Sequence, residues 1–74
     1  MTFLEKIGDR IKELRNAKQL SQEDLSAMAD ISRTYLSGVE NGKKNIAAEN
    51  IEKIIDALEI SAEEFFKHKN FRKK

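Results

Sequence analysis

Residues 22–41 read QEDLSAMADISRTYLSGVEN, and the pattern of this segment is the strongest indication of the fold. Its apolar and small side chains recur at helical spacing on both sides of a short break at 29–32. These side chains are Leu25, Ala29, Ile31, Leu36 and Val39. They can be buried together only if two short helices, over residues 22–28 and 33–41, cross closely at a tight corner. Ser21 with Asp24 forms a capping-box pattern before the first helix, and Ser32 is the expected cap of the second.

The second of these helices has a polar outer face. Leu36 and Val39 take its inward positions, so the positions between them face outward. The outward residues are Arg33, Thr34, Ser37 and Gly38. The second helix would therefore project from the surface of a small domain, with long hydrogen-bonding side chains on its outer face. Two short helices arranged in this way have the geometry of a helix-turn-helix. The second helix of that motif enters the major groove of DNA.

The rest of the chain is also periodic, so the predicted fold is all-α, a compact five-helix bundle. A first helix runs from about residue 3 to 17 or 18, a fourth spans roughly 48–59, and a short fifth follows Ser61. Their apolar positions are Leu4, Ile7, Ile11 and Leu14, then Ile51, Ile54, Ile55 and Leu58, then Phe65 and Phe66. Residues 1–69 are expected to form one domain, followed by a disordered basic tail over 70–74. Weak assistance to DNA binding is the alternative role for this tail.

The composition excludes several kinds of site. The 74 residues include no cysteine and one histidine, His68, so neither a disulfide nor a metal site is expected, and no cofactor. No Gly-rich phosphate loop occurs and the carboxylates fall on charged helix faces, which argues against an enzyme. Without a signal segment or an apolar run of about 20 residues, the chain is expected in the cytoplasm and not in a membrane.

Residues 7–60 resemble the repressor-type (XRE/Cro-like) helix-turn-helix family, whose fold is the lambda-repressor-like five-helix domain. The resemblance rests on Gln22, on the buried pattern above, and on VENGK at 39–43. Within the family, SRTYLSGVE at 32–40 and SAEEFF at 61–66 are similar to controller proteins of restriction–modification systems. Two residues depart from the family pattern: Asp30 replaces a usual glycine and Ser26 a usual alanine. Aspartate tolerates the left-handed region at some cost, and Ser26 is expected to bond its own helix backbone.

The resemblance implies that the helix over 33–41 reads base edges. The implied base contacts are Arg33, Thr34, Tyr35 and Ser37. Arg33 lies in the first turn, where its guanidinium can bond O6 and N7 of a guanine, a contact worth about 1–3 kcal/mol of discrimination. Tyr35 has a second interpretation, as a half-buried tyrosine that serves the core.

The resemblance also assigns residues beside the groove. The implied phosphate contacts are Gln22, Asn41, Lys43, Lys44 and Asn45, with Gln22 aided by the amides at the start of its helix. The alternative for the two lysines is a plain solvated loop. Arg15 and Glu40 stand where the family has a partly buried ion pair between the first and third helices, which would orient the recognition helix.

One recognition helix contacts few base pairs, so such a regulator is expected to bind DNA as a homodimer. Its double-stranded operator would have two-fold symmetry, with half-sites about 34–36 Å apart in the major groove. The candidate dimer interface comprises apolar residues left over from core packing, namely Ile54, Leu58, Ile60, Phe65 and Phe66. The alternative for the two phenylalanines is that they cover the domain's own core.

These observations and the resemblance predict a DNA-binding transcription regulator, a homodimeric controller that autoregulates a restriction–modification operon. An antitoxin or a phage-type repressor built on the same domain is the alternative. Residues 46–64 carry six acidic side chains and one lysine, whereas residues 65–74 carry five basic side chains and no acidic one. The acidic side is a candidate contact for RNA polymerase, although surface acid is too common to support that contact alone.

Overall fold

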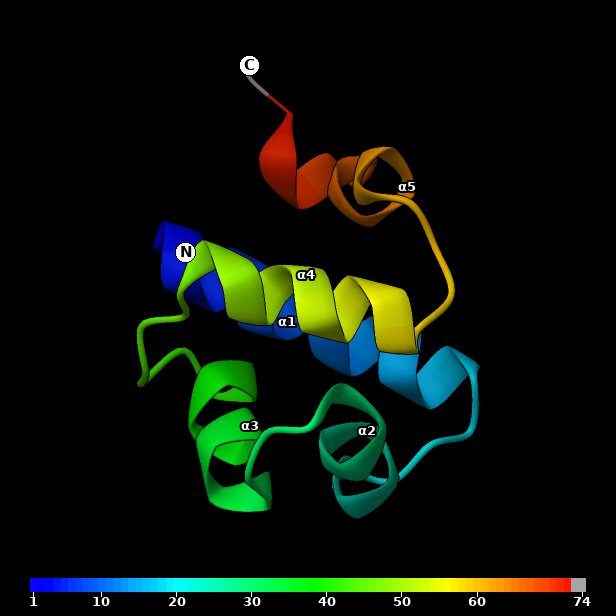
Figure 1. Cartoon of the computed structure of the whole chain (residues 1–74). Coiled ribbons are helices and arrows are strands. Elements are labelled where there is room, and N and C mark those ends of the chain that lie inside the picture. Colours follow the sequence, from blue (N-terminus) through cyan, green and yellow to red (C-terminus); the bar gives the residue numbers. More distant parts are fainter. Residues whose placement is uncertain (73–74) are drawn as a thin grey trace.

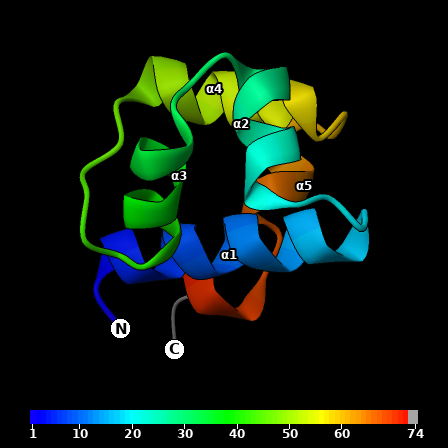
Figure 2. The same ribbon diagram turned by 90° about the horizontal axis from the view of Figure 1, so that it is seen from below.

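The computed structural model describes residues 1–72, and helices are the only regular elements in that range. They are α1 (Phe3–Ala17), α2 (Gln22–Ala29), α3 (Arg33–Glu40), α4 (Ala48–Ala57), α5 (Ala62–Phe66) and a 3-10 turn, η1 (Lys69–Phe71). In Figure 1, α1 and α4 run across the middle, with α2 and α3 below them and α5 with η1 above. The view from below shows α2 and α3 spanning the space between α4 and α1 (Figure 2). The predicted all-α fold of five helices is confirmed, and none of the described helices is long and apolar enough to cross a membrane.

Local capping bonds start most of these helices. Thr2 forms a complete capping box with Glu5 at the start of α1, and Ser21 forms one with Asp24 at the start of α2. The backbone amide and side chain of Thr2 lower the pKa of the Glu5 carboxyl, and those of Ser21 lower the pKa of the Asp24 carboxyl. The caps of α3 and α5 are Ser32 and Ser61. The predicted capping roles of the three serines are therefore confirmed, and the Thr2 capping box is a fourth helix cap that was not predicted.

One hydrophobic core is shared by all five helices. Its fully buried members are Ile7, Ile11, Leu25, Ala29, Leu36, Val39, Ile54, Ile55, Leu58 and Phe65. Four of the five residues predicted to close the corner between α2 and α3 are among them, and the fifth, Ile31, packs against the core half-buried. The core therefore forms behind the two short helices and supports both from one side.

Asp30 and Ser26 shape the corner between α2 and α3 as predicted. Asp30 has φ 58° and ψ 47°, the left-handed conformation that ends α2. The Ser26 hydroxyl donates to the Glu23 carbonyl at 3.0 Å, and the Ile31 amide donates to the Ser26 carbonyl at 3.0 Å. These bonds fix the direction in which the chain leaves α2 to begin α3.

A glycine lets α1 and α3 touch. A Cβ atom at Gly8 would stand 2.2 Å from the Val39 carbonyl oxygen and 2.8 Å from that of Glu40. Both are backbone atoms of α3, which no side-chain rotation can move away. Gly8 therefore sets the depth at which α3 sits on α1.

The end of the chain packs on α1, which corrects the predicted disordered tail for residues 70–72. The Asn70 side chain donates to Asp9 at 3.0 Å, and the Phe71 ring meets the Phe66 ring edge-on with centroids 5.1 Å apart. Apolar and polar contacts together join this segment to α1 and α5. Residues 73 and 74, the rest of that prediction, lie outside the described residues. The segment lies on the side of the molecule away from α2 and α3 (Figure 1).

Candidate nucleic-acid interface

The outer side of α3 carries the residues predicted to read bases. Arg33 and Thr34 are exposed in its first turn, and Ser37 is half-buried one turn later. On the opposite side Leu36 and Val39 are 0% and 1% exposed, so the core fixes the orientation of the helix. Figure 2 shows α3 at the surface, between α2 and the loop that leads to α4. The three polar residues thus share one face, and their contacts with bases remain a prediction.

A buried ion pair holds α3 against α1, as predicted. Arg15 Nε lies 2.7 Å from Glu40 Oε2 and Nη2 lies 3.0 Å from Oε1, a bidentate pair whose side chains are 11% and 1% exposed. The remaining Arg15 nitrogen, Nη1, donates to the Leu20 carbonyl at 2.7 Å. One guanidinium therefore ties α1, the turn before α2 and the end of α3 together.

Gln22 belongs to the same network. Its Nε2 donates to Glu40 Oε1 at 3.1 Å, so the amide predicted to hold a phosphate is engaged within the protein. Beside it lies a surface hollow lined by Arg15, Ser21, Gln22, Glu23 and Arg33. The first amides of α2 have no partner within the helix and lie at this hollow, which keeps a phosphate contact there as a prediction.

Tyr35 faces the loop between α3 and α4. Its hydroxyl donates to the Asn45 carbonyl at 3.2 Å and accepts from the Asn50 side chain at 3.2 Å, while the ring packs half-buried against the core. The hydroxyl thus connects the recognition helix to the loop and to the first turn of α4. This arrangement agrees with the half-buried interpretation, and the base contact of Tyr35 remains a prediction.

The loop after α3 presents the other residues predicted to touch phosphates. Gly42 has φ 70°, and the amides of Lys43 and Lys44 both donate to the Gly38 carbonyl, at 2.9 and 3.2 Å. This folds the loop back on α3, with the stem of Lys44 across Gly38. The exposed residues here are Asn41, Lys43, Lys44 and Asn45. They form a cationic and amide-bearing edge on one side of α3, and their phosphate contacts remain predictions.

The predicted dimer interface is wrong at three of its five positions. Ile54, Leu58 and Phe65 are 0% exposed because they point into the core of their own chain, where no second copy can reach them. Ile60 stays half-buried at the surface and Phe66 is 36% exposed. Phe65 therefore covers the domain's own core, which was the alternative interpretation, whereas Phe66 lies at the surface.

The two surface residues border an apolar groove between α4 and α5. Ile51 and Ile55, four residues apart on α4, supply its other large apolar side chains. The groove is completed by Ala48, Glu52, Asp56, Ser61 and Ala62. Periodicity predicted every isoleucine of α4 to face inward. It could not distinguish Ile54, which enters the core, from Ile51 and Ile55, which also line the groove at the border of the core.

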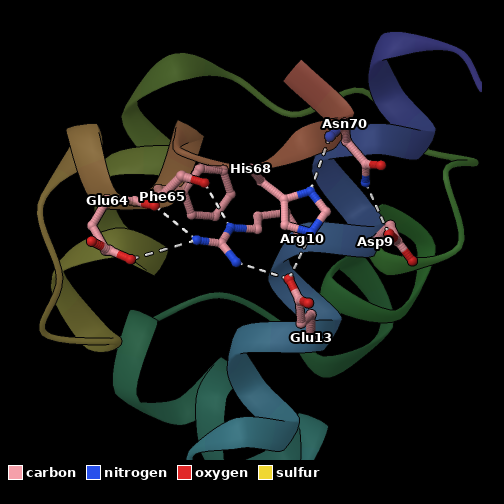
Figure 3. Close-up of polar contacts among 7 residues, drawn as sticks. All are labelled: Asp9, Arg10, Glu13, Glu64, Phe65, His68 and Asn70. Carbon is pink, nitrogen blue, oxygen red and sulfur yellow. Dashed lines mark hydrogen bonds and ion pairs between the residues drawn. The ribbon is translucent and has the colours of Figure 1, made fainter. Parts of the chain in front are cut away.

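Arg10 is a structural residue that the sequence interpretation missed. It is 7% exposed, and its guanidinium reaches the last turn of α5 (Figure 3). The signal was its position within the apolar stripe of α1, three residues after Ile7 and four before Leu14. A charged side chain on the buried face of a helix requires partners, but the sequence could not name carbonyl groups more than 50 residues away.

Known proteins share both the sequence and the fold. Residues 11–65 match the Helix-turn-helix family. The control protein C.MunI of a Mycoplasma species is 45% identical over 62 residues, covering 82% of this chain and 84% of that relative. The crystal structure of the restriction–modification controller protein C.AhdI from Aeromonas hydrophila superposes with a TM-score of 0.82 and 46% identity, over 85% of this chain and 96% of that one.

A second controller protein has been solved on DNA. The controller protein C.Esp1396I, as a tetramer in complex with its natural 35 base-pair operator, superposes with a TM-score of 0.84 and 37% identity, over 90% of each chain. Matches of this identity and coverage show the family. This chain is a member of the helix-turn-helix family and, within it, of the controller proteins of restriction–modification systems.

Proposed function

We propose that this protein is a sequence-specific DNA-binding transcription regulator that autoregulates a restriction–modification operon. The observation that carries the proposal is the exposed first turn of α3, with Arg33 and Thr34 outside and the Arg15–Glu40 pair fixing the helix behind them. A helix held in this way presents the Arg33 guanidinium to the groove from a fixed backbone position. Family membership supports the same function, because operator DNA is bound by the relative C.Esp1396I.

The segments on the two sides of α3 extend the proposed DNA-binding surface. The lysines of the 41–45 loop lie on one side of α3, and the first amides of α2 lie on the other. Phosphates on the two strands that border a major groove would meet these two edges while α3 lies between them. Phosphate contacts of this kind position the protein, and Arg33 supplies discrimination between bases.

The active form in this proposal is a homodimer joined through the α4–α5 groove. The exposed parts of the half-buried Ile51 and Ile60 side chains, and of Phe66, leave water when a second copy covers them. Two copies related by a two-fold axis use the same patch on each subunit and would present two recognition helices to a symmetric operator. The tetrameric state of C.Esp1396I on its operator supports binding by more than one copy.

In this function the protein binds DNA in the cytoplasm and does not act as an enzyme. The single histidine is already occupied, since His68 Nε2 lies 3.2 Å from Glu13 and Nδ1 accepts from the Asn70 amide at 3.1 Å. Neither nitrogen is free to serve as a general base. If the regulator activates transcription, we propose the acidic side chains of α4 and α5 that lie outside the groove as the contact for RNA polymerase.

Selection of duplexes from a randomised pool, at near-physiological salt, tests this function. Wild type should enrich a two-fold-symmetric motif, and Arg33→Ala should lose a guanine preference while retaining phosphate-driven binding. Lys53→Ala, which removes one positive charge from an exposed position on α4 outside the groove, is the matched control and should enrich the wild-type motif. If no motif is enriched and binding collapses with salt, the regulator proposal fails and a protein partner such as a toxin becomes the alternative.

A further inference from the structure

Arg10 clamps the end of α5 from within α1. Its Nε donates to the Phe65 carbonyl at 2.7 Å and its Nη2 donates to the Glu64 carbonyl at 2.8 Å (Figure 3). These carbonyls belong to the last turn of α5, where helix carbonyls run short of partners, although the Glu64 carbonyl also accepts from the amide of the capping residue Lys67 at 3.2 Å. A five-residue helix has little stability of its own, so the two hydrogen bonds from the Arg10 guanidinium stabilise α5.

The same arginine begins a network that holds the following residues. Arg10 Nη1 donates to Glu13 at 2.8 Å, and the same Glu13 oxygen lies 3.2 Å from His68 Nε2. His68 Nδ1 accepts from the Asn70 amide at 3.1 Å, and the Asn70 side chain donates to Asp9 at 3.0 Å. We call residues 67–72, held to α1 by these bonds, the C-terminal latch. In Figure 3 its polar side chains converge on the side of α1 that faces α5.

The latch packs its aromatic residue against the groove. The Phe71 ring meets the Phe66 ring edge-on, with centroids 5.1 Å apart. On the core side, the Phe65 ring also meets the Phe66 ring edge-on, with centroids 4.9 Å apart. Phe66 is thus held by rings at two sides while part of its surface lines the groove beside Ile51 and Ile60. Without Phe71, one of these supports would be replaced by water and the ring would gain rotamer freedom.

We propose that the C-terminal latch is a positioning element for self-association, with Arg10 as its anchor and Phe66 as the side chain it presents to a second copy. This inference rests on the homodimer of the proposed function. A contact residue that is ordered before binding loses less entropy on association, so the latch should increase affinity without touching the partner. Residues 67–72 would then control dimerisation, and through it operator occupancy, from the side opposite α2 and α3.

Sedimentation of the full chain without DNA tests this role. Phe71→Ala should raise the dimer dissociation constant by about tenfold, from the restored freedom of the Phe66 ring and the lost packing behind it. Phe3→Ala is the matched control, because the Phe3 ring also packs on Phe71, at 6.1 Å, but is 60% exposed and does not line the groove. The control should leave the dissociation constant within about twofold of wild type.

Two further variants separate positioning from general stability. Phe71→Leu keeps an apolar side chain, so it should fold where Phe71→Ala does not, and should still weaken the dimer. Arg10→Lys keeps the charge but cannot bond two carbonyls and Glu13 together, and should weaken the dimer at temperatures where circular dichroism reports a folded chain. Unchanged dissociation constants in these folded variants would overturn the inference, as would a monomeric wild type. Unchanged constants would leave the homodimer of the proposed function in place, whereas a monomeric wild type would remove that homodimer as well, so the two results distinguish failure of the inference from failure of the proposed function.

Discussion

At the scale of single residues, Glu40 is a buried carboxylate that depends on its hydrogen-bond donors. Its carboxylate accepts from Arg15 Nε, from Arg15 Nη2 and from Gln22 Nε2, in a position where its side chain is 1% exposed. Burying a carboxylate costs several kcal/mol unless such partners compensate. The three donors come from α1 and the start of α2, so one acidic residue fixes how three helices meet.

Neutralising Glu40 should therefore destabilise the fold strongly. Glu40→Gln leaves the Arg15 guanidinium buried without a counter-charge, and we expect the unfolding free energy to fall by about 3 kcal/mol in urea titrations. Glu23→Gln, an exposed position on the neighbouring helix, is the control and should change it by less than about 0.5 kcal/mol. The double variant Arg15→Met with Glu40→Leu should be more stable than Glu40→Gln; a less stable double variant would contradict this account.

The Tyr35 hydroxyl allows its two interpretations to be separated. Tyr35→Phe removes the bonds to the Asn45 carbonyl and the Asn50 side chain, but keeps the ring against the core. If the hydroxyl only anchors the loop, operator affinity should fall by about 3- to 10-fold, near 1 kcal/mol, with base preferences unchanged. Competition binding against single-base operator variants provides the measurement. A preference lost at one base pair would instead assign Tyr35 to direct readout.

At the scale of elements, the helix starts could be predicted and some of the ends could not. Starts depend on local capping: Ser21, Ser32 and Ser61 each bond the amide three residues later. The fourth helix was predicted to reach residue 59 but ends at Ala57, because the chain turns through Glu59 at φ 59°. No glycine marks that turn in the sequence, so the left-handed residue could not be foreseen.

The crossing of α1 and α3 depends on Gly8, which gives a direct test. A methyl group there would collide with backbone atoms of α3, so Gly8→Ala should lower the unfolding free energy by about 2 kcal/mol and weaken operator binding by moving α3. Gly38→Ala is the control, because its Cβ would meet only the flexible Lys44 side chain. We expect that variant within about 1 kcal/mol of wild type in thermal unfolding. Equal losses in both would show that the crossing is not set at Gly8.

At the scale of the whole molecule, the candidate site was predictable where contacts are close in sequence or carried by the family pattern. The outer face of α3 and the Arg15–Glu40 pair belong to this class. The bonds of Arg10 to α5 span 54 and 55 residues, and the split of α4 into a core seam and a groove seam depends on where α5 packs. Periodicity reports which side of a helix is apolar, but not which neighbour covers it, and this is why three dimer residues were misplaced.

The groove between α4 and α5 links oligomeric state to operator occupancy, and a charge placed in it tests that link. In an isologous dimer Ile51→Lys would introduce two lysines into one apolar interface, which should raise the dimer dissociation constant about 100-fold or more. The monomer should stay folded, since Ile51 is only half-buried and a lysine there can extend its ammonium into water. Titration of the selected operator should then show a higher midpoint and a shallower curve, while a single half-site is bound as by wild type. Lys53→Ala, an exposed neighbour outside the groove, should leave the curve unchanged. A steep wild-type curve in Ile51→Lys would place the interface between copies on another surface.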